Sequence, residues 1–156
     1  MCLLYEFLLI KADNEGINVY EKEIGKLKGL YFDGNIIINS SIETNSEKAC
    51  ILAEELGHHY TTHGNILNQC KVENRKQERR ARAWAYERLV SLNSLIEASK
   101  HCIRNRFELA EFLGVSERFI DEAIQYYKEK YGICHKVGDY IVYFEPLGVL
   151  KKVQKE

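Results

Sequence analysis

Two adjacent glutamates and a histidine have the spacing of a metal-binding motif. Glu54, Glu55 and His58 lie in residues 52–61 at the positions of an H-E-x-x-H sequence, except that the first position is a glutamate. Residues four apart share one face of a helix, so Glu54 and His58 can hold one metal ion between them. Glu55 then lies one step round the helix, where a carboxylate can take a proton from metal-bound water. The spacing therefore predicts a hydrolytic metal site with Glu55 as its base.

A third metal ligand is expected from a neighbouring helix, and Glu78 is the leading candidate. The Glu78-x-x-Ala81 spacing puts a carboxylate and a small residue on one face, and the alanine would let the two helices approach closely. Glu73 and Glu87 are alternatives. The simpler interpretation is that Glu78 is one surface charge among neighbouring arginines, which are Arg75, Arg79 and Arg80.

The motif could also belong to an ordinary amphipathic helix whose charges face water. Its neighbours are strongly apolar, however, so Glu54 and His58 are not expected to be merely solvated. Gly57 leaves room beside the pair, as a substrate channel would need. A hairpin precedes the helix, and a strand edge can hold an extended peptide by main-chain hydrogen bonds.

The other histidines form weaker patterns. His59 and His63 are also four residues apart, but no carboxylate stands where a general base would be needed, and His63 lies near the end of the helix. His101 and His135 each neighbour a cysteine, and we interpret these single doublets as packing.

The segments around the motif predict an α+β fold, with a small antiparallel sheet packed on the motif helix and a helical C-terminal part. The strongest strand signal is Asp33-Gly34 between two apolar runs, which is typical of a hairpin. Thr44 and Glu47 match a capping box that starts the motif helix, and Gly64 is a candidate for its end. Further helices are expected over residues 1–15, 75–90 and 92–99, strands over 17–20 and 139–144, and a loop over 64–74.

The C-terminal part contains a helix-turn-helix pattern. Two helical runs within residues 106–130 are separated by a turn at Gly114, and Ser116 caps the second run. The second run carries more acidic than basic residues, whereas phosphate contacts supply most non-specific affinity for DNA. We therefore interpret the pair as structural or as a contact for a protein partner, and we do not expect DNA binding.

The composition is that of one ordinary globular domain. The chain has 156 residues, 46% of them hydrophobic, and a net charge of −1, which gives no footprint for nucleic acid or for a membrane surface. We divide this domain into residues 1–100, with the sheet and the active-site helices, and residues 101–156, with the helix-turn-helix pattern and one terminal strand.

No run approaches the ~18 apolar residues of a membrane span. Glu6 interrupts the apolar N-terminus and no cleavage site follows, so we expect no signal peptide. Five scattered cysteines without a C-x-x-C pair indicate reduced thiols, and we expect a cytoplasmic protein.

Taken together, the motifs resemble the ImmA/IrrE-type metallopeptidases of phages and integrative elements. The resemblance rests on residues 29–33, on the motif helix, and on residues 78–90, which are similar to the family's E-x-x-A-x-x-(F/W)-A helix. Residues 109–115 and 143–146 are similar to the tail of the phage-type members. The resemblance implies a compact α+β zincin-like domain that cleaves a protein partner, usually a phage or element repressor or a related transcription regulator. It also implies that Glu55 is the catalytic residue and that Glu54, His58 and Glu78 are the metal ligands, with Glu54 in place of the usual first histidine.

The glutamate at position 54 changes the expected chemistry. Two carboxylates and one imidazole are a harder ligand set than two histidines and one glutamate, and less selective for zinc over manganese or iron. A second anionic ligand also lowers the Lewis acidity of the ion and raises the pKa of its bound water. We expect a zinc-type metalloendopeptidase, with manganese or iron as alternative ions. The alternative is a catalytically weak or inactive pseudo-peptidase that binds a regulator protein, and a third hypothesis is a DNA-binding regulator that uses residues 106–130.

Overall fold

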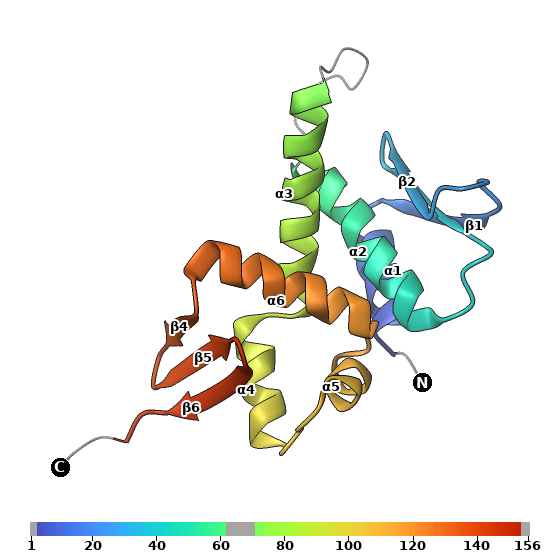
Figure 1. Ribbon diagram of the computed structural model, residues 1–156. Helices are drawn as coiled ribbons and strands as arrows, with labels where there is room; N and C mark the ends of the chain where they lie inside the picture. The colour runs from blue at the N-terminus through green and yellow to red at the C-terminus, as the bar shows by residue number, and fades with distance from the viewer. Residues whose placement is uncertain (1–2, 62–70, 154–156) are drawn as a thin grey trace.

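The computed structural model describes residues 3–61 and 71–153, which form helices and two small sheets (Figure 1). The helices are α1 (Leu3–Asn14), α2 (Asn45–Thr61), α3 (Lys71–Leu89), α4 (Leu92–Lys100), α5 (Arg106–Leu113) and α6 (Glu117–Tyr131). The strands are β1 (Asn18–Lys22), β2 (Gly29–Phe32), β3 (Asn35–Asn39), β4 (Cys134–Val137), β5 (Tyr140–Phe144) and β6 (Leu147–Lys151). The α+β class expected from the sequence is confirmed. Within these ranges no helix has both the length and the apolar character that crossing a membrane requires.

The N-terminal sheet has the strand order β1-β3-β2. The β2–β3 hairpin is antiparallel as expected, and Asp33 and Gly34 both have positive φ, 43° and 74°, as a tight two-residue turn demands. However, β1 pairs parallel to β3, so the sheet is mixed and not purely antiparallel. The buried Asn39 holds the connection between β1 and β2 in place, because its amide donates hydrogen bonds to the carbonyls of Gly25 (3.0 Å) and Leu27 (2.7 Å). The strand order β1-β3-β2 could not be predicted, because the hydrophobic periodicity of a single strand does not indicate which strand it pairs with.

Helix α2 lies at the centre of the fold, between the N-terminal sheet, α1 and α3 (Figure 1). One half of the expected capping box is present, since the backbone N–H of Glu47 donates to Oγ1 of Thr44 at 3.3 Å, while the Glu47 carboxylate accepts from Lys28 at 2.8 Å. Neighbouring elements cover α2 on several sides, as its apolar sequence requires. Its buried residues are Ala49, Cys50, Ile51, Leu52, Ala53, Leu56 and Gly57.

The C-terminal part is built on α6, which crosses α3 (Figure 1). The turn between α5 and α6 follows the sequence, because Gly114 is left-handed (φ 71°) and the Ser116 hydroxyl accepts a hydrogen bond from the N–H of Phe119. The buried Tyr127 fixes α6 to the end of α3 by donating from its hydroxyl to the Val90 carbonyl at 2.9 Å. This helix is therefore a core element and not an isolated recognition helix.

Two expectations for the chain after α2 need correction. Helix α3 begins at Lys71, so residues 71–74 are helical and not part of a loop, while Gly64 and the rest of the expected loop lie outside the described residues. The terminal strand is one of three, because β4 and β6 pair with β5 on either side. The sequence patterns of β4 and β6 are weak because both are short and largely exposed, and β6 contains Gly148. No disulfide joins the cysteines at positions 50, 102 and 134, and Cys2 and Cys70 are not among the described residues.

Glu21 connects three elements, and this predicts a pH-dependent contribution to stability. Its carboxylate accepts hydrogen bonds from the Tyr5 hydroxyl of α1 and the Lys48 ammonium of α2, each at 2.7 Å. The bond from Lys48, and then the one from Tyr5, lowers the pKa of Glu21. A carboxyl whose pKa is lowered by folding stabilises the native state above its unfolded pKa, and this stability is lost as pH falls through the folded pKa.

We expect Glu21→Gln to lower the free energy of unfolding by about 1 kcal/mol at pH 7, since the group is half-exposed and screened by solvent. The difference from wild type should shrink as the pH falls below the ordinary Glu value of 4.5. Urea unfolding at both pH values measures this, and Glu6→Gln on the exposed side of α1 is the matched control. An equal loss of stability at neutral and acid pH would show that the ionised carboxylate is not what joins these elements.

Candidate active site

The site depends on the close approach of α2 and α3 at Gly57. A Cβ atom on Gly57 would lie 2.3 Å from the backbone oxygen of Ala81 and 3.0 Å from its Cα, so only glycine fits at this crossing. The expectation that Ala81 lets the helices approach is confirmed. The expectation that Gly57 opens a substrate channel is wrong, because α3 fills the space beside it.

This crossing brings His58 of α2 and Glu78 of α3 together. Nε2 of His58 lies 3.1 Å from Oε2 of Glu78, while the other oxygen, Oε1, lies 3.2 Å from Nε of Arg82. The bond to Glu78 raises the pKa of His58, and the same bond lowers the pKa of Glu78. The expected second and third metal ligands are therefore neighbours, and Arg82 holds the outer side of the Glu78 carboxylate.

Glu55 lies against the first residues of β2. A Cβ atom on Gly29 would lie 2.6 Å from Oε1 of Glu55 and 2.7 Å from Cγ2 of Ile51, so the strand passes directly over the carboxylate. The backbone of Tyr31 forms a hydrogen bond with Glu55. Burial raises the pKa of Glu55 to about 7, against the opposing effects of His58 and of the Tyr31 hydrogen bond. A carboxyl with such a pKa can both accept and donate a proton near neutral pH.

Glu54, the expected first ligand, lies in a different environment. It lines a cavity of about 290 Å³ together with Arg82, Arg118 and Glu122. Burial raises the pKa of Glu54, and among nearby charges the Arg82 guanidinium has the largest effect, ahead of Glu122, Glu78 and His58. The structure therefore places Glu54 with the arginines between α2, α3 and α6.

The described residues supply part of a metal site. The contacting atoms of His58 and Glu78, 3.1 Å apart, are as close as two ligands that each lie about 2.0–2.2 Å from one ion. Among residues 3–61 and 71–153, however, no group of three or more His, Cys, Asp or Glu side chains is placed to hold a metal ion. His58 and Glu78 thus fit a shared ion, and the assignment of Glu54 as the third ligand stays a prediction.

The remaining candidates have other roles or lie outside the described part. Nδ1 of His59 is 2.9 Å from the Tyr31 hydroxyl, and the His59 ring packs edge-on against Tyr60. His101 bonds to a helix carbonyl and His135 stacks on Tyr131, in agreement with a packing role. Glu87 bonds to residues of α6, which are Tyr126 and Lys130. The position of His63 and the side chain of Glu73 are not described.

Sequence reasoning missed two residues at this site. Arg82 was not considered, although it stands four residues after Glu78, a spacing at which opposite charges pair on a helix. Tyr31 was treated only as part of a strand, although its backbone bonds Glu55 and its hydroxyl bonds His59. The first of these could have been found from spacing, whereas the second depends on the fold.

A comparison with protein-family models matches residues 12–125 to the IrrE N-terminal-like domain, the Peptidase_M78 family. The chain belongs to this family. The match contains Glu54, Glu55, His58 and Glu78, and it ends within α6. Membership in Peptidase_M78 supports a metallopeptidase-type function with a protein substrate. A search of the curated proteins found no match.

We expect Gly57→Ala to lower the free energy of unfolding by about 2 kcal/mol or more, because the added methyl group meets backbone atoms of α3 that cannot move without parting the helices. This loss should exceed the gain of about 1 kcal/mol from better helix propensity. Thermal or urea unfolding measures it. Gly148→Ala is the control, since a Cβ there meets no atom within 4 Å and should leave stability nearly unchanged. A Gly57→Ala protein as stable as wild type would contradict the close approach.

Proposed function

We propose that the protein is a metal-dependent endopeptidase that cuts a protein partner, with a repressor-like transcription regulator as the expected substrate. The observation that carries this proposal is the convergence of Glu55 with the His58–Glu78 pair beside strand β2. A buried carboxylate, a metal-binding pair and a strand edge are the parts that peptide hydrolysis needs.

Strand β2 would align the substrate. It is the edge strand of the sheet, with β3 on one side only. The Tyr31 backbone forms a hydrogen bond with Glu55, which places this part of β2 beside the carboxylate. An extended substrate segment that adds to this edge would bring its scissile bond near Glu55.

In the proposed reaction Glu55 moves one proton. It accepts the proton of the attacking water as the new carbon–oxygen bond forms, and it delivers that proton to the leaving amine as the carbon–nitrogen bond breaks. An ion bound by His58 and Glu78 would supply polarisation of the scissile carbonyl. Strand β2 passes close over Glu55 and excludes water from one side of its carboxylate. The hydrogen bond from the Tyr31 backbone orients the same carboxylate.

We expect Glu55→Gln to reduce cleavage of a co-expressed cognate repressor by about 10²-fold or more, because the amide cannot accept the proton. Product fragments on a gel or in a mass spectrum measure this, and Glu111→Gln on α5, away from the site, is the control. If Glu55→Gln cut the repressor at the wild-type rate, this mechanism would be abandoned.

Metal content tests the ligand set directly. We expect about one equivalent of zinc, manganese or iron in protein purified without chelator, and none in His58→Ala or Glu78→Ala, because these remove the ligand pair. Glu54→Gln decides the role of Glu54: loss of the ion indicates a third ligand, whereas an affinity lowered by only roughly 10–100-fold indicates a nearby group that does not ligate the ion. Elemental mass spectrometry measures all four proteins. Metal retained in both His58→Ala and Glu78→Ala would contradict this ligand set.

A binding-only role is the second candidate, and the environment of Glu54 favours it. If Glu54 stays in the cavity with Arg82 and Arg118, only His58 and Glu78 are left to hold an ion, and the protein would bind its partner without cutting it. This role predicts a stable complex with the repressor and no product fragments. Wild-type protein that contains metal and produces fragments excludes it.

A further inference from the structure

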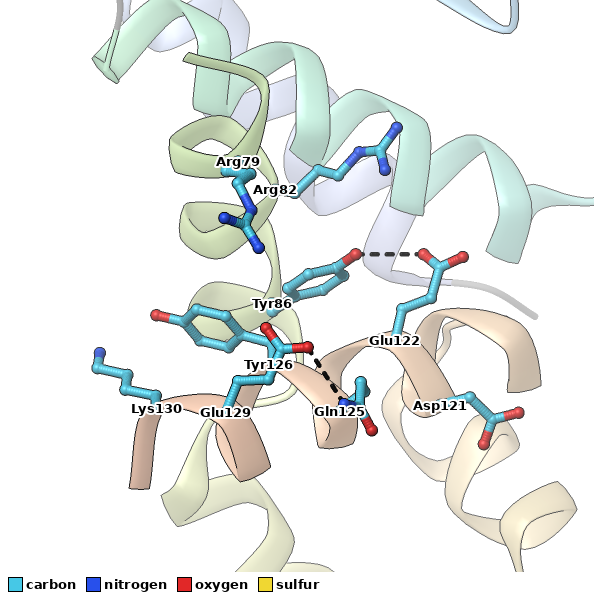
Figure 2. Close-up of a pocket in the computed structure, with 9 residues that line it drawn as sticks. All are labelled: Arg79, Arg82, Tyr86, Asp121, Glu122, Gln125, Tyr126, Glu129 and Lys130. Carbon is cyan, nitrogen blue, oxygen red and sulfur yellow. Dashed lines mark hydrogen bonds between the residues drawn. The ribbon is translucent and has the colours of Figure 1, made fainter. Parts of the chain in front are cut away.

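A groove between α3 and α6 lies beside the candidate active site. It has a volume of about 660 Å³, within the range of ligand sites. The side chains that matter for its chemistry are Arg79, Arg82 and Tyr86 of α3 and Gln125, Tyr126 and Glu129 of α6 (Figure 2). We refer to it as the α3–α6 groove.

The α3–α6 groove begins at residues that belong to the active site. Arg82 lines the groove and also bonds Glu78, the partner of His58. Arg82 and Glu122 line the cavity of Glu54 as well, so the two hollows share a wall. A helix rises ~1.5 Å per residue, so Tyr86 lies ~12 Å along α3 from Glu78, a span of about four extended residues. The groove therefore extends along α3 from the His58–Glu78 pair.

Most charges along the α3–α6 groove are already compensated within the protein. Arg82 pairs with Glu78, and Glu122 accepts from Arg118 and from the Tyr86 hydroxyl. At the edges, Asp121 pairs with Arg106 and Lys130 pairs with Glu87. These groups need no ligand.

Two opposite charges on facing walls are not compensated by an ion pair. No ion pair or hydrogen bond to the Arg79 side chain is found within the described part of the chain, and its guanidinium projects from α3 into the groove (Figure 2). On the α6 wall, Glu129 accepts only from the neutral Gln125 amide, at 3.1 Å, as far as the described side chains show. A guanidinium in such a position can bind a carboxylate in two parallel hydrogen bonds.

Between these charges the floor of the groove is aromatic. The hydroxyls of Tyr86 and Tyr126 are both occupied, by Glu122 at 3.2 Å and Glu87 at 2.5 Å. The two rings lie 5.7 Å apart between centroids (Figure 2). Tyr86 is only 7% exposed, so the half-buried Tyr126 ring offers most of the aromatic surface, and the Lys130 ammonium lies 5.5 Å from its centroid. Such a surface suits a bulky apolar side chain.

We propose that the α3–α6 groove binds a segment of the protein substrate in which an acidic and a basic residue flank a bulky apolar residue. The acidic side chain pairs with Arg79, the apolar one packs mainly on Tyr126 beside the buried Tyr86, and the basic one pairs with Glu129. This inference rests on the proposed function for the identity of the occupant, but binding to the groove does not require cleavage.

The test selects binding peptides without cleavage. Full-length Glu55→Gln protein is immobilised and a phage-displayed library of random peptides is enriched on it, in parallel with Arg79→Glu and Arg80→Glu versions. Arg80 is the matched control, because it is an exposed neighbour on α3 that does not line the groove. The most enriched peptide is synthesised with a fluorescent label and its affinity for each protein is measured by anisotropy.

We expect the Glu55→Gln and Arg80→Glu proteins to enrich peptides with an acidic residue beside a bulky apolar one. Arg79→Glu should lower the affinity for the labelled peptide about tenfold, as expected for the loss of one charge-assisted pair. It should also enrich peptides that have a basic residue in place of the acidic one. Circular dichroism confirms the fold of each variant. Identical selections on Arg79→Glu, or no enriched peptide on any protein, would overturn the proposal, and the latter would point to a small-molecule occupant. A charge-reversed selection together with no repressor cleavage by wild type would retain the groove and reject the peptidase.

Discussion

The backbone contact between Gly57 and Ala81 is the constraint on which the rest of the site depends. Helices with ordinary side chains at a crossing pack 8–10 Å apart, and a glycine against an alanine permits a closer approach. With a wider separation, the short reach of His58 would not meet Glu78 across the two helices. The contact between His58 and Glu78 is thus a consequence of helix packing as much as of the identity of the two residues.

Arg82 controls the electrostatics of this region. It pairs with Glu78 and is also the strongest charge acting on Glu54, so one guanidinium compensates two carboxylates that burial would otherwise tend to protonate. Glu55 is not paired in this way, and its pKa of about 7 follows from burial under β2. The pKa values of Glu54 and Glu55 are therefore raised and that of Glu78 is lowered, and these differences come from the neighbours of each carboxylate.

The sequence was most informative where a single residue type has a local physical meaning. Asp33-Gly34 predicted the hairpin, Ser116 predicted the start of α6, and the Glu78-x-x-Ala81 spacing predicted the helix that meets His58. It was least informative about pairing and direction. The parallel β1, the strands on both sides of β5 and the arginine environment of Glu54 all depend on contacts between distant segments, which hydrophobic periodicity does not encode. The interpretation of Gly57 as space for substrate was wrong for the same reason. The sequence shows that a side chain is missing there, but not that the backbone of α3 occupies the place.

The end of the family match inside α6 has a consequence for how such a protein can diversify. The matched residues 12–125 include the whole of α3, and hence Arg79 with the hydrolytic pair, whereas Tyr126, Glu129 and Lys130 lie beyond the match. The α3 wall of the α3–α6 groove thus lies wholly within the family match, whereas the α6 wall lies partly beyond it. If the groove binds substrate as proposed, single changes at Tyr126 or Glu129 would alter partner choice while leaving Glu55, His58 and Glu78 in place, so recognition could change along this chain without a change at the candidate site.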